Sequence, residues 1–125
     1  FISDLVRHLN IHCEVDFIKI SSYVGKESVG EINMTKDLDL DIKNRSVIII
    51  EDIIDSGKSI KYLYDYISNL NPKDIAVISL LAKKSISKLN FKIDFIGFEI
   101  SSEFVVGYGM DYNQKLRNLR SIYKL

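Results

Sequence analysis

The sequence predicts an α/β fold in which a mainly parallel sheet is flanked by helices. The strongest observation is Val47–Ile50, a continuous β-branched run that suits a central strand covered on both faces. A helical repeat of apolar residues follows this run, and Ile75–Leu81 and Asp94–Phe98 predict a second and a third buried strand. Strand, helix, strand and strand in this order favour an α/β fold with right-handed crossovers.

The first third of the chain predicts a helix followed by a hairpin. Apolar residues recur at helical spacing through Phe1–Leu9, which predicts a helix with one buried face. An apolar run over residues 15–20 predicts a strand that ends at residues 21–23. Residues 24–31 contain two glycines and alternating charges and are expected to form a mobile loop. Ile32–Thr35 is then the return strand of a long, flexible hairpin.

Residues 37–71 predict an exposed turn, the central strand and a helix. Asp37–Asn44 is acidic, but it lacks the glycine and the terminal glutamate of a calcium-binding loop, so we expect a turn. The helix ends at Asn71–Pro72, because proline disfavours helical geometry in the residue before it. The helical repeat consists of Ile60, Leu63, Tyr64, Ile67 and Leu70.

Composition narrows the functional classes. The 125 residues suit one domain over 1–125, with 46% hydrophobic and 27% charged residues. Lys plus Arg and Asp plus Glu number 17 each, and this balance argues against a nucleic-acid binder. No apolar run approaches the ~20 residues of a membrane helix, and no signal peptide is evident. Because Phe1 falls inside an amphipathic pattern, we expect the natural chain to begin upstream.

Cys13 is the single cysteine, so an internal disulfide is impossible and a reducing, cytoplasmic compartment is expected. Its neighbours His12 and Glu14 make a metal site conceivable. A small buried or half-buried side chain at the start of a strand is the favoured interpretation. His8 and His12 belong to no motif and are expected at the surface or in packing.

The segment from Val47 to Ser59 is the most informative part of the sequence. A buried strand ends in the adjacent carboxylates Glu51 and Asp52, a third carboxylate follows at Asp55, and a short turn opens a helix. In open α/β sheets the ligand crevice lies beyond the carboxyl ends of the strands. The plain alternative, a solvated strand end, explains the glycine turn less well.

The turn over residues 55–59 resembles a phosphate cradle. Gly57 allows close approach of the backbone, amide groups at a helix start favour an anion, and Ser56 and Ser59 add hydroxyl donors. A P-loop is excluded, because the position five residues before Gly57 is Asp52 rather than glycine. Carboxylates beside such a cradle suit sugar hydroxyls and Mg²⁺, so the segment predicts a ribose 5-phosphate site.

The run Glu51-Asp-Ile-Ile-Asp-Ser-Gly-Lys-Ser59 resembles the phosphoribosyl pyrophosphate (PRPP) signature of type I phosphoribosyltransferases, in its hypoxanthine-guanine form. Ser22-Tyr23 with its glycine-containing loop resembles the family's lid. Leu80–Lys84 resembles the strand end with a purine-contacting lysine, and residues 94–100, 103–113 and Arg117 resemble the base- and metal-binding part. The resemblance spans the chain and implies purine salvage: hypoxanthine, and guanine, react with PRPP to give IMP or GMP and pyrophosphate.

The resemblance assigns roles to individual residues. Asp55 is the general acid/base facing N7 of the purine, with helix capping as its simpler alternative. Lys83 contacts O6 of a 6-oxopurine; Lys84 is its competitor, and a surface lysine is the simpler alternative. Phe104 stacks on the base. PRPP would bind through Glu51, Asp52, Asp55, Ser56, Gly57, Lys58 and Ser59; the purine through Ile53, Lys83, Phe104, Val105 and Asp111; pyrophosphate through Ser22, Tyr23 and Arg117; and Mg²⁺ through Asp111, Glu51 and Asp52.

The simpler alternatives are a core position for Phe104, a turn aspartate for Asp111 and a solvated helix arginine for Arg117. The resemblance also implies a cytoplasmic homodimer or homotetramer with small-molecule substrates. One departure is that a further pyrophosphate loop of the family would lie upstream of Phe1.

Two other functions fit part of the pattern. A receiver-like signalling domain would use Asp52 or Asp55 as phospho-acceptor, but it leaves the cradle and the run from Phe104 to Asp111 unexplained. A regulatory protein that senses PRPP without turnover would be indicated by loss of Asp55 or by a basic surface. Asp55 is present and the formal net charge is zero, so this alternative is not favoured.

Overall fold

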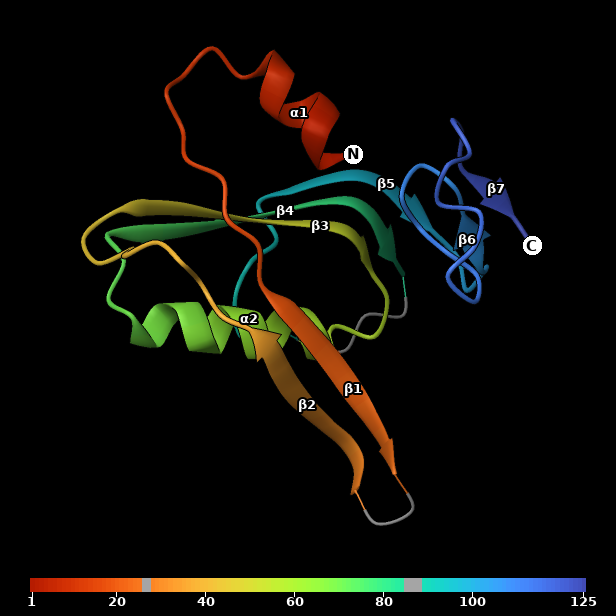
Figure 1. Cartoon of the computed structure of the whole chain (residues 1–125), viewed down its shortest axis with the longest axis horizontal. Coiled ribbons are helices and arrows are strands. Elements are labelled where there is room, and N and C mark those ends of the chain that lie inside the picture. The colour runs from red at the N-terminus through yellow and green to blue at the C-terminus, as the bar shows by residue number, and fades with distance from the viewer. Residues whose placement is uncertain (26–27, 85–88) are drawn as a thin grey trace. The chain divides into compact units, whose positions relative to one another are not determined.

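The computed structural model describes residues 1–25, 28–84 and 89–125 (Figure 1). They form two compact units, one of residues 1–10, 48–57 and 76–125 and the other of residues 11–47 and 58–75. The elements in chain order are α1 (Ile2–His8), β1 (Lys19–Gly25), β2 (Ser28–Lys36), β3 (Ser46–Ile54), α2 (Lys58–Asn69), β4 (Asp74–Lys83), β5 (Phe95–Ile100), β6 (Val105–Val106) and β7 (Tyr123–Lys124).

The predicted three-stranded sheet is present, with the order β3-β4-β5 and β4 at its centre (Figure 1). β4 and β5 pair in parallel, from Ile78 opposite Phe95 to Lys83 opposite Ile100. β4 is the most deeply buried strand, and Val77 and Ser79 have no exposed surface. The buried Ser79 hydroxyl donates to the Leu81 carbonyl at 2.6 Å, so its burial leaves no hydroxyl unpaired.

The prediction of full burial is wrong for parts of the two outer strands. Ile48 on β3 is 45% exposed, and Phe95 and Phe98 on β5 are 61% and 65% exposed. Each outer strand has one neighbouring strand, and no described segment covers these side chains completely. Within the predicted run Val47–Ile50 only Ile49 is buried, whereas Val47 and Ile50 are half-buried. Ile54, at the end of β3, is buried as well.

The helix predicted after β3 is α2, and its buried residues are Ile60, Leu63 and Ile67. Spacings of three and four place them on one face. The chain leaves the helix through Asn71, whose φ of 54° is left-handed, immediately before Pro72. The helix start at Lys58 lies two residues earlier than the apolar repeat, because polar residues can form a first turn without contributing to periodicity.

The long hairpin is confirmed, but its strands are displaced from the predicted positions. β1 and β2 pair antiparallel, and they include residues 24–25 and 28–31 of the expected loop; residues 26–27 lie outside the described part. β1 begins at Lys19, and in the irregular segment before it Asp16 is hydrogen-bonded to residues 39–40. Its carboxylate accepts hydrogen bonds from Leu40, Phe17 and Asp39 amides, which lower the pKa of Asp16 to about 2.

Neither of the helices in the described part of the chain is long and apolar enough to cross a membrane.

Gly97 on β5 provides a test of strand packing. A Cβ at Gly97 would lie 2.7 Å from the carbonyl oxygen of Leu80 on β4. We therefore expect Gly97→Ala to lower the free energy of unfolding by about 1–3 kcal/mol in urea denaturation, since backbone must shift. Glu99→Ala, at an exposed position of the same strand, should change it by less than about 0.5 kcal/mol. Equal stability of both variants would contradict this packing.

Candidate active site at the carboxyl ends of β3 and β4

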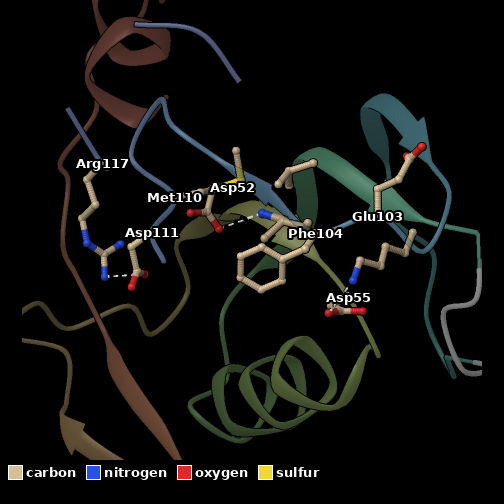
Figure 2. A pocket seen from close by; sticks show the side chains of 10 residues that line it. Asp52, Asp55, Glu103, Phe104, Met110, Asp111 and Arg117 are labelled. Carbon is tan, nitrogen blue, oxygen red and sulfur yellow. Dashed lines mark hydrogen bonds and ion pairs between the residues drawn. The ribbon is translucent and has the colours of Figure 1, made fainter. Parts of the chain in front are cut away.

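A pocket of about 270 Å³ lies at the carboxyl ends of β3 and β4 and is closed by the C-terminal segment (Figure 2). This is the edge of the sheet at which the sequence places the ligand. Ten side chains from one compact unit line the pocket: Asp52, Ile53, Asp55, Lys83, Glu103, Phe104, Val105, Met110, Asp111 and Arg117.

Asp55 and Lys83 form an ion pair in this pocket. The Lys83 Nζ donates to Asp55 Oδ2 at 2.8 Å, joining the bend after β3 to the end of β4. The Lys83 side chain is only 11% exposed, whereas Asp55 is 64% exposed. The Lys83 ammonium is thus held in one place, and the Asp55 carboxylate is open to a ligand.

The structure places Lys83 and Lys84 differently. Lys83 is the last residue of β4, and Lys84 lies in the turn that follows it. Lys83 lines it, whereas Lys84 is exposed and its amide donates to the Ile100 carbonyl. The alternative of a surface lysine therefore applies to Lys84 and not to Lys83.

Phe104 and Val105 form the apolar wall of the pocket. Phe104 is 51% exposed, so the alternative core position is wrong. Its ring lies edge-on to Tyr112, with centroids 5.8 Å apart and planes at 84°, and this contact orients the ring without covering it. Val105 is fixed by β6, where it pairs with Lys124 of β7.

Asp111 and Arg117 form a second ion pair in the lining, with Arg117 Nη2 2.7 Å from Asp111 Oδ1. The other Asp111 oxygen accepts the Gln114 amide at 2.8 Å, and Arg117 also donates to the Gly109 carbonyl at 2.9 Å. Arg117 lies in a segment of turns, so the alternative of a helix arginine is wrong. Figure 2 shows the two side chains together at one end of the pocket.

Glu51 and Asp52 are consecutive residues of β3, and only Asp52 is part of the pocket lining. Asp52 Oδ1 accepts the Ile53 amide at 2.7 Å. Glu51 is half-buried; desolvation and then the charge of Asp52 raise the pKa of Glu51 to about 7. This carboxyl therefore changes its charge near neutral pH.

Residues 55–57 form the bend expected of a phosphate cradle, and α2 begins at Lys58. Gly57 has a φ of 84° and is buried, so the glycine is required for conformation. Ser56, Lys58 and Ser59 are exposed. The bend therefore presents polar groups to solvent.

The predicted lid residues Ser22 and Tyr23 lie in β1, and their side chains are outside the described part of the chain. Glu103 and Met110 also line the pocket, although neither was predicted individually as a site residue. Glu103 pairs with Lys124 at 2.9 Å, and this hydrogen bond is the main cause of its lowered pKa. Both lie in the run 103–113 that resembles the base- and metal-binding part, and this membership was the signal for them.

The expectation for Cys13 is wrong: Cys13 is exposed and lies outside any strand. No group of three His, Cys, Asp or Glu side chains that would enclose a metal occurs among the described residues, which include His12 and Glu14. Mg²⁺ does not require such an enclosure, since it is commonly bound by one or two carboxylates, water and substrate phosphates. Asp111 and Asp52, which line one pocket, fit that mode.

Comparisons with known proteins show the family to which the chain belongs. Residues 1–113 match the phosphoribosyl transferase domain model. A hypoxanthine phosphoribosyltransferase of Buchnera aphidicola is 46% identical over the whole chain and 71% of the relative, and a hypoxanthine-guanine phosphoribosyltransferase of Bacillus subtilis is 45% identical over 95% of the chain and 67% of the relative.

Solved structures of the same family have the same fold. A hypoxanthine-guanine phosphoribosyltransferase of Bacillus anthracis superposes with a TM-score of 0.91 at 38% identity, covering 99% of this chain and 74% of that one. A Trypanosoma cruzi hypoxanthine phosphoribosyltransferase variant complexed with IMP gives 0.89 at 33% identity, covering 99% and 64%.

The raised pKa of Glu51 predicts a pH-dependent stability. Below its ordinary pKa of 4.5 the carboxyl is neutral in both folded and unfolded chains, whereas above about 7 it is charged in both and the folded chain bears the desolvation cost. Glu51→Gln should therefore raise the free energy of unfolding at pH 8 by up to ~3 kcal/mol and change it little near pH 4.5. Urea denaturation at both pH values measures this.

The exposed Glu99→Gln is the matched control and should leave both denaturation curves unchanged. An effect of Glu51→Gln that is the same at both pH values would contradict the assignment.

Proposed function

Because the chain belongs to the hypoxanthine-guanine phosphoribosyltransferases, we propose that the pocket of Asp55, Lys83 and Phe104 is where the purine reacts. The chain is a purine-salvage phosphoribosyltransferase, and its reaction replaces the pyrophosphate of PRPP by a purine. This membership removes the receiver-like alternative. We propose hypoxanthine as the main purine substrate and guanine as an alternative one.

The Asp55–Lys83 pair is the observation that supports this proposal most strongly. A 6-oxopurine presents O6 and N7 side by side on one edge. Lys83 donates to O6, while the Asp55 carboxylate faces N7 and accepts its proton. Adenine has an amino group in place of O6, and this amino group would meet the Lys83 ammonium, donor against donor.

In the reaction, N9 of the purine forms a bond to C1 of the ribose as the bond from C1 to pyrophosphate breaks. The electron pair of the breaking bond leaves with pyrophosphate, and the N7 proton passes to Asp55. A positioned base of this kind contributes roughly 10²–10⁴-fold to the rate. The Asp55 charge also stabilises positive charge that develops at C1.

The remaining lining residues hold the base. The exposed face of Phe104 stacks on the purine, with Ile53 and Val105 beside it. The local backbone of residues 55–59 supports a 5-phosphate, since Gly57 opens the bend and the helix start favours an anion. Glu51 and Asp52 receive the ribose hydroxyls, and Arg117 contacts pyrophosphate. Ser22 and Tyr23 remain the proposed lid.

Mg²⁺ is the proposed cofactor, with Asp111 as its direct ligand and Glu51 and Asp52 as acceptors for its water shell. When bound, it neutralises charge on the pyrophosphate that leaves. Arg117, which pairs with Asp111, holds the carboxylate oriented. We also propose a cytoplasmic enzyme that forms a homodimer or homotetramer; oligomeric state is a topic of work on a Trypanosoma cruzi relative.

A purine panel with PRPP and Mg²⁺ tests the function. We expect nucleotide from hypoxanthine and guanine, little from adenine, and a fall of roughly 10²-fold or more in kcat for Asp55→Asn. Chromatography of IMP, GMP and AMP is the measurement. Equal turnover of adenine would contradict the role of Lys83, and full activity of the variant would contradict the role of Asp55.

The adjacent lysines provide a matched pair for specificity. Lys83→Met removes the buried ammonium, so kcat/KM for hypoxanthine should fall by about 10²–10³-fold, as for loss of a positioned donor. Lys84→Met removes an exposed ammonium and should change kcat/KM by less than about twofold, since Lys84 does not line the pocket. Steady-state kinetics would contradict the assignment if the two variants behaved alike.

A further inference from the structure

Asp111 lies between two tight turns of the same kind. Gly107 bridges Met110, and Tyr112 bridges Lys115, each pair enclosing two residues. All four enclosed residues are left-handed, with φ of 54° at Tyr108, 103° at Gly109, 50° at Asn113 and 65° at Gln114. Two-residue loops with positive φ at both positions favour Asn and Gly. Tyr108 and Gln114 are therefore the two residues that this preference does not explain, and Tyr108 is the one whose side chain contacts a distant element.

The turn at Tyr108 is held from several sides. A left-handed conformation costs roughly 1–3 kcal/mol outside glycine, so surrounding contacts must maintain it. The Tyr108 amide donates to the Leu119 carbonyl at 2.8 Å, and the Gly109 amide donates to the Arg117 carbonyl at 3.0 Å. A Cβ at Gly107 would overlap the Ser121 carbonyl, so the backbone is in close contact there as well.

The Tyr108 side chain adds a contact with a distant part of the chain. Its hydroxyl donates to Asp4 Oδ2 at 2.6 Å, and Asp4 lies on α1 in the same compact unit. Asp4 is also paired with Arg7 one turn further along α1. The hydrogen bond raises the pKa of Tyr108 and lowers that of Asp4, as expected of a donor and an ionised acceptor.

We propose that Asp4 and Tyr108 are a positioning pair, in which α1 holds the turn before Asp111 and so sets the Asp111 carboxylate for the metal and pyrophosphate. Neither residue lines the pocket, so the pair acts through Asp111, three residues beyond Tyr108. The backbone contacts hold one side of this turn, and the Tyr108 hydroxyl adds an anchor on α1 for a conformation that is unfavourable outside glycine. The inference rests on the proposed function of Asp111 as a Mg²⁺ ligand.

Tyr108→Phe tests the pair, because it removes the hydroxyl and keeps the ring. Loss of one charge-assisted hydrogen bond should raise the half-saturating Mg²⁺ concentration for IMP formation about three- to tenfold, with kcat at saturation nearly unchanged. Hydrogen exchange should become faster at the amides of Gly109 and Gln114, which does not depend on turnover. Tyr123→Phe, which removes an exposed tyrosine hydroxyl on β7, is the control and should change none of these quantities.

A double-mutant cycle separates the pair from its surroundings. Asp4→Ala should reproduce Tyr108→Phe, and the double variant should be no worse than either. Asp4→Asn keeps an acceptor oxygen and should restore most of the Mg²⁺ response. Additive effects would overturn the pairing, and faster exchange with an unchanged Mg²⁺ requirement would show a merely structural bond. An inactive wild-type protein would instead refute the proposed function.

Discussion

The ion pair between Asp55 and Lys83 is the constraint on which the pocket depends. It joins the end of β4 to the bend after β3 through two groups of opposite charge. Because Lys83 is almost enclosed, its ammonium needs a partner, and Asp55 supplies one before any purine arrives. A ligand that offers an acceptor and an acidic proton side by side can replace this contact without leaving either charge unpaired.

The carboxylates near the end of β3 lower the stability of the fold, because Glu51 is largely desolvated there. Glu51 follows an apolar strand and is desolvated beside Asp52, which is why its pKa is raised to about 7. A chain with glutamine at this position would be more stable at alkaline pH, since no charge would be buried. In the function we propose, the Glu51 carboxylate gains partners from the ribose hydroxyls and the cation, so substrate binding offsets part of its desolvation cost.

Periodicity explains which parts of the fold were predictable. β3 and β4 follow from the apolar runs Val47–Ile50 and Ile75–Leu81, and α2 follows from the helical repeat, because burial determines these patterns. The start of β1 was misplaced: Asp16 accepts hydrogen bonds from the amides of Asp39 and Leu40, outside its own run, and no periodic pattern reports such contacts. The end of β4 separates Lys83, its last residue, from Lys84 in the turn that follows, and composition does not report where a strand ends. Cys13 was misassigned because the strand expected to bury it begins six residues later.

The C-terminal segment shows why a site can be recognised before its geometry is understood. The sequence supplied Phe104, Asp111 and Arg117 as site residues, but it indicated neither the two turns around Asp111 nor the contact from Tyr108 to Asp4. Turns with positive φ at non-glycine residues oppose local preference, so tertiary contacts must impose them. The hydrogen bonds from Tyr108 and Gly109 to the 117–119 backbone are such contacts. An irregular segment can therefore hold Asp111 as firmly as a strand would, because its conformation is determined from outside.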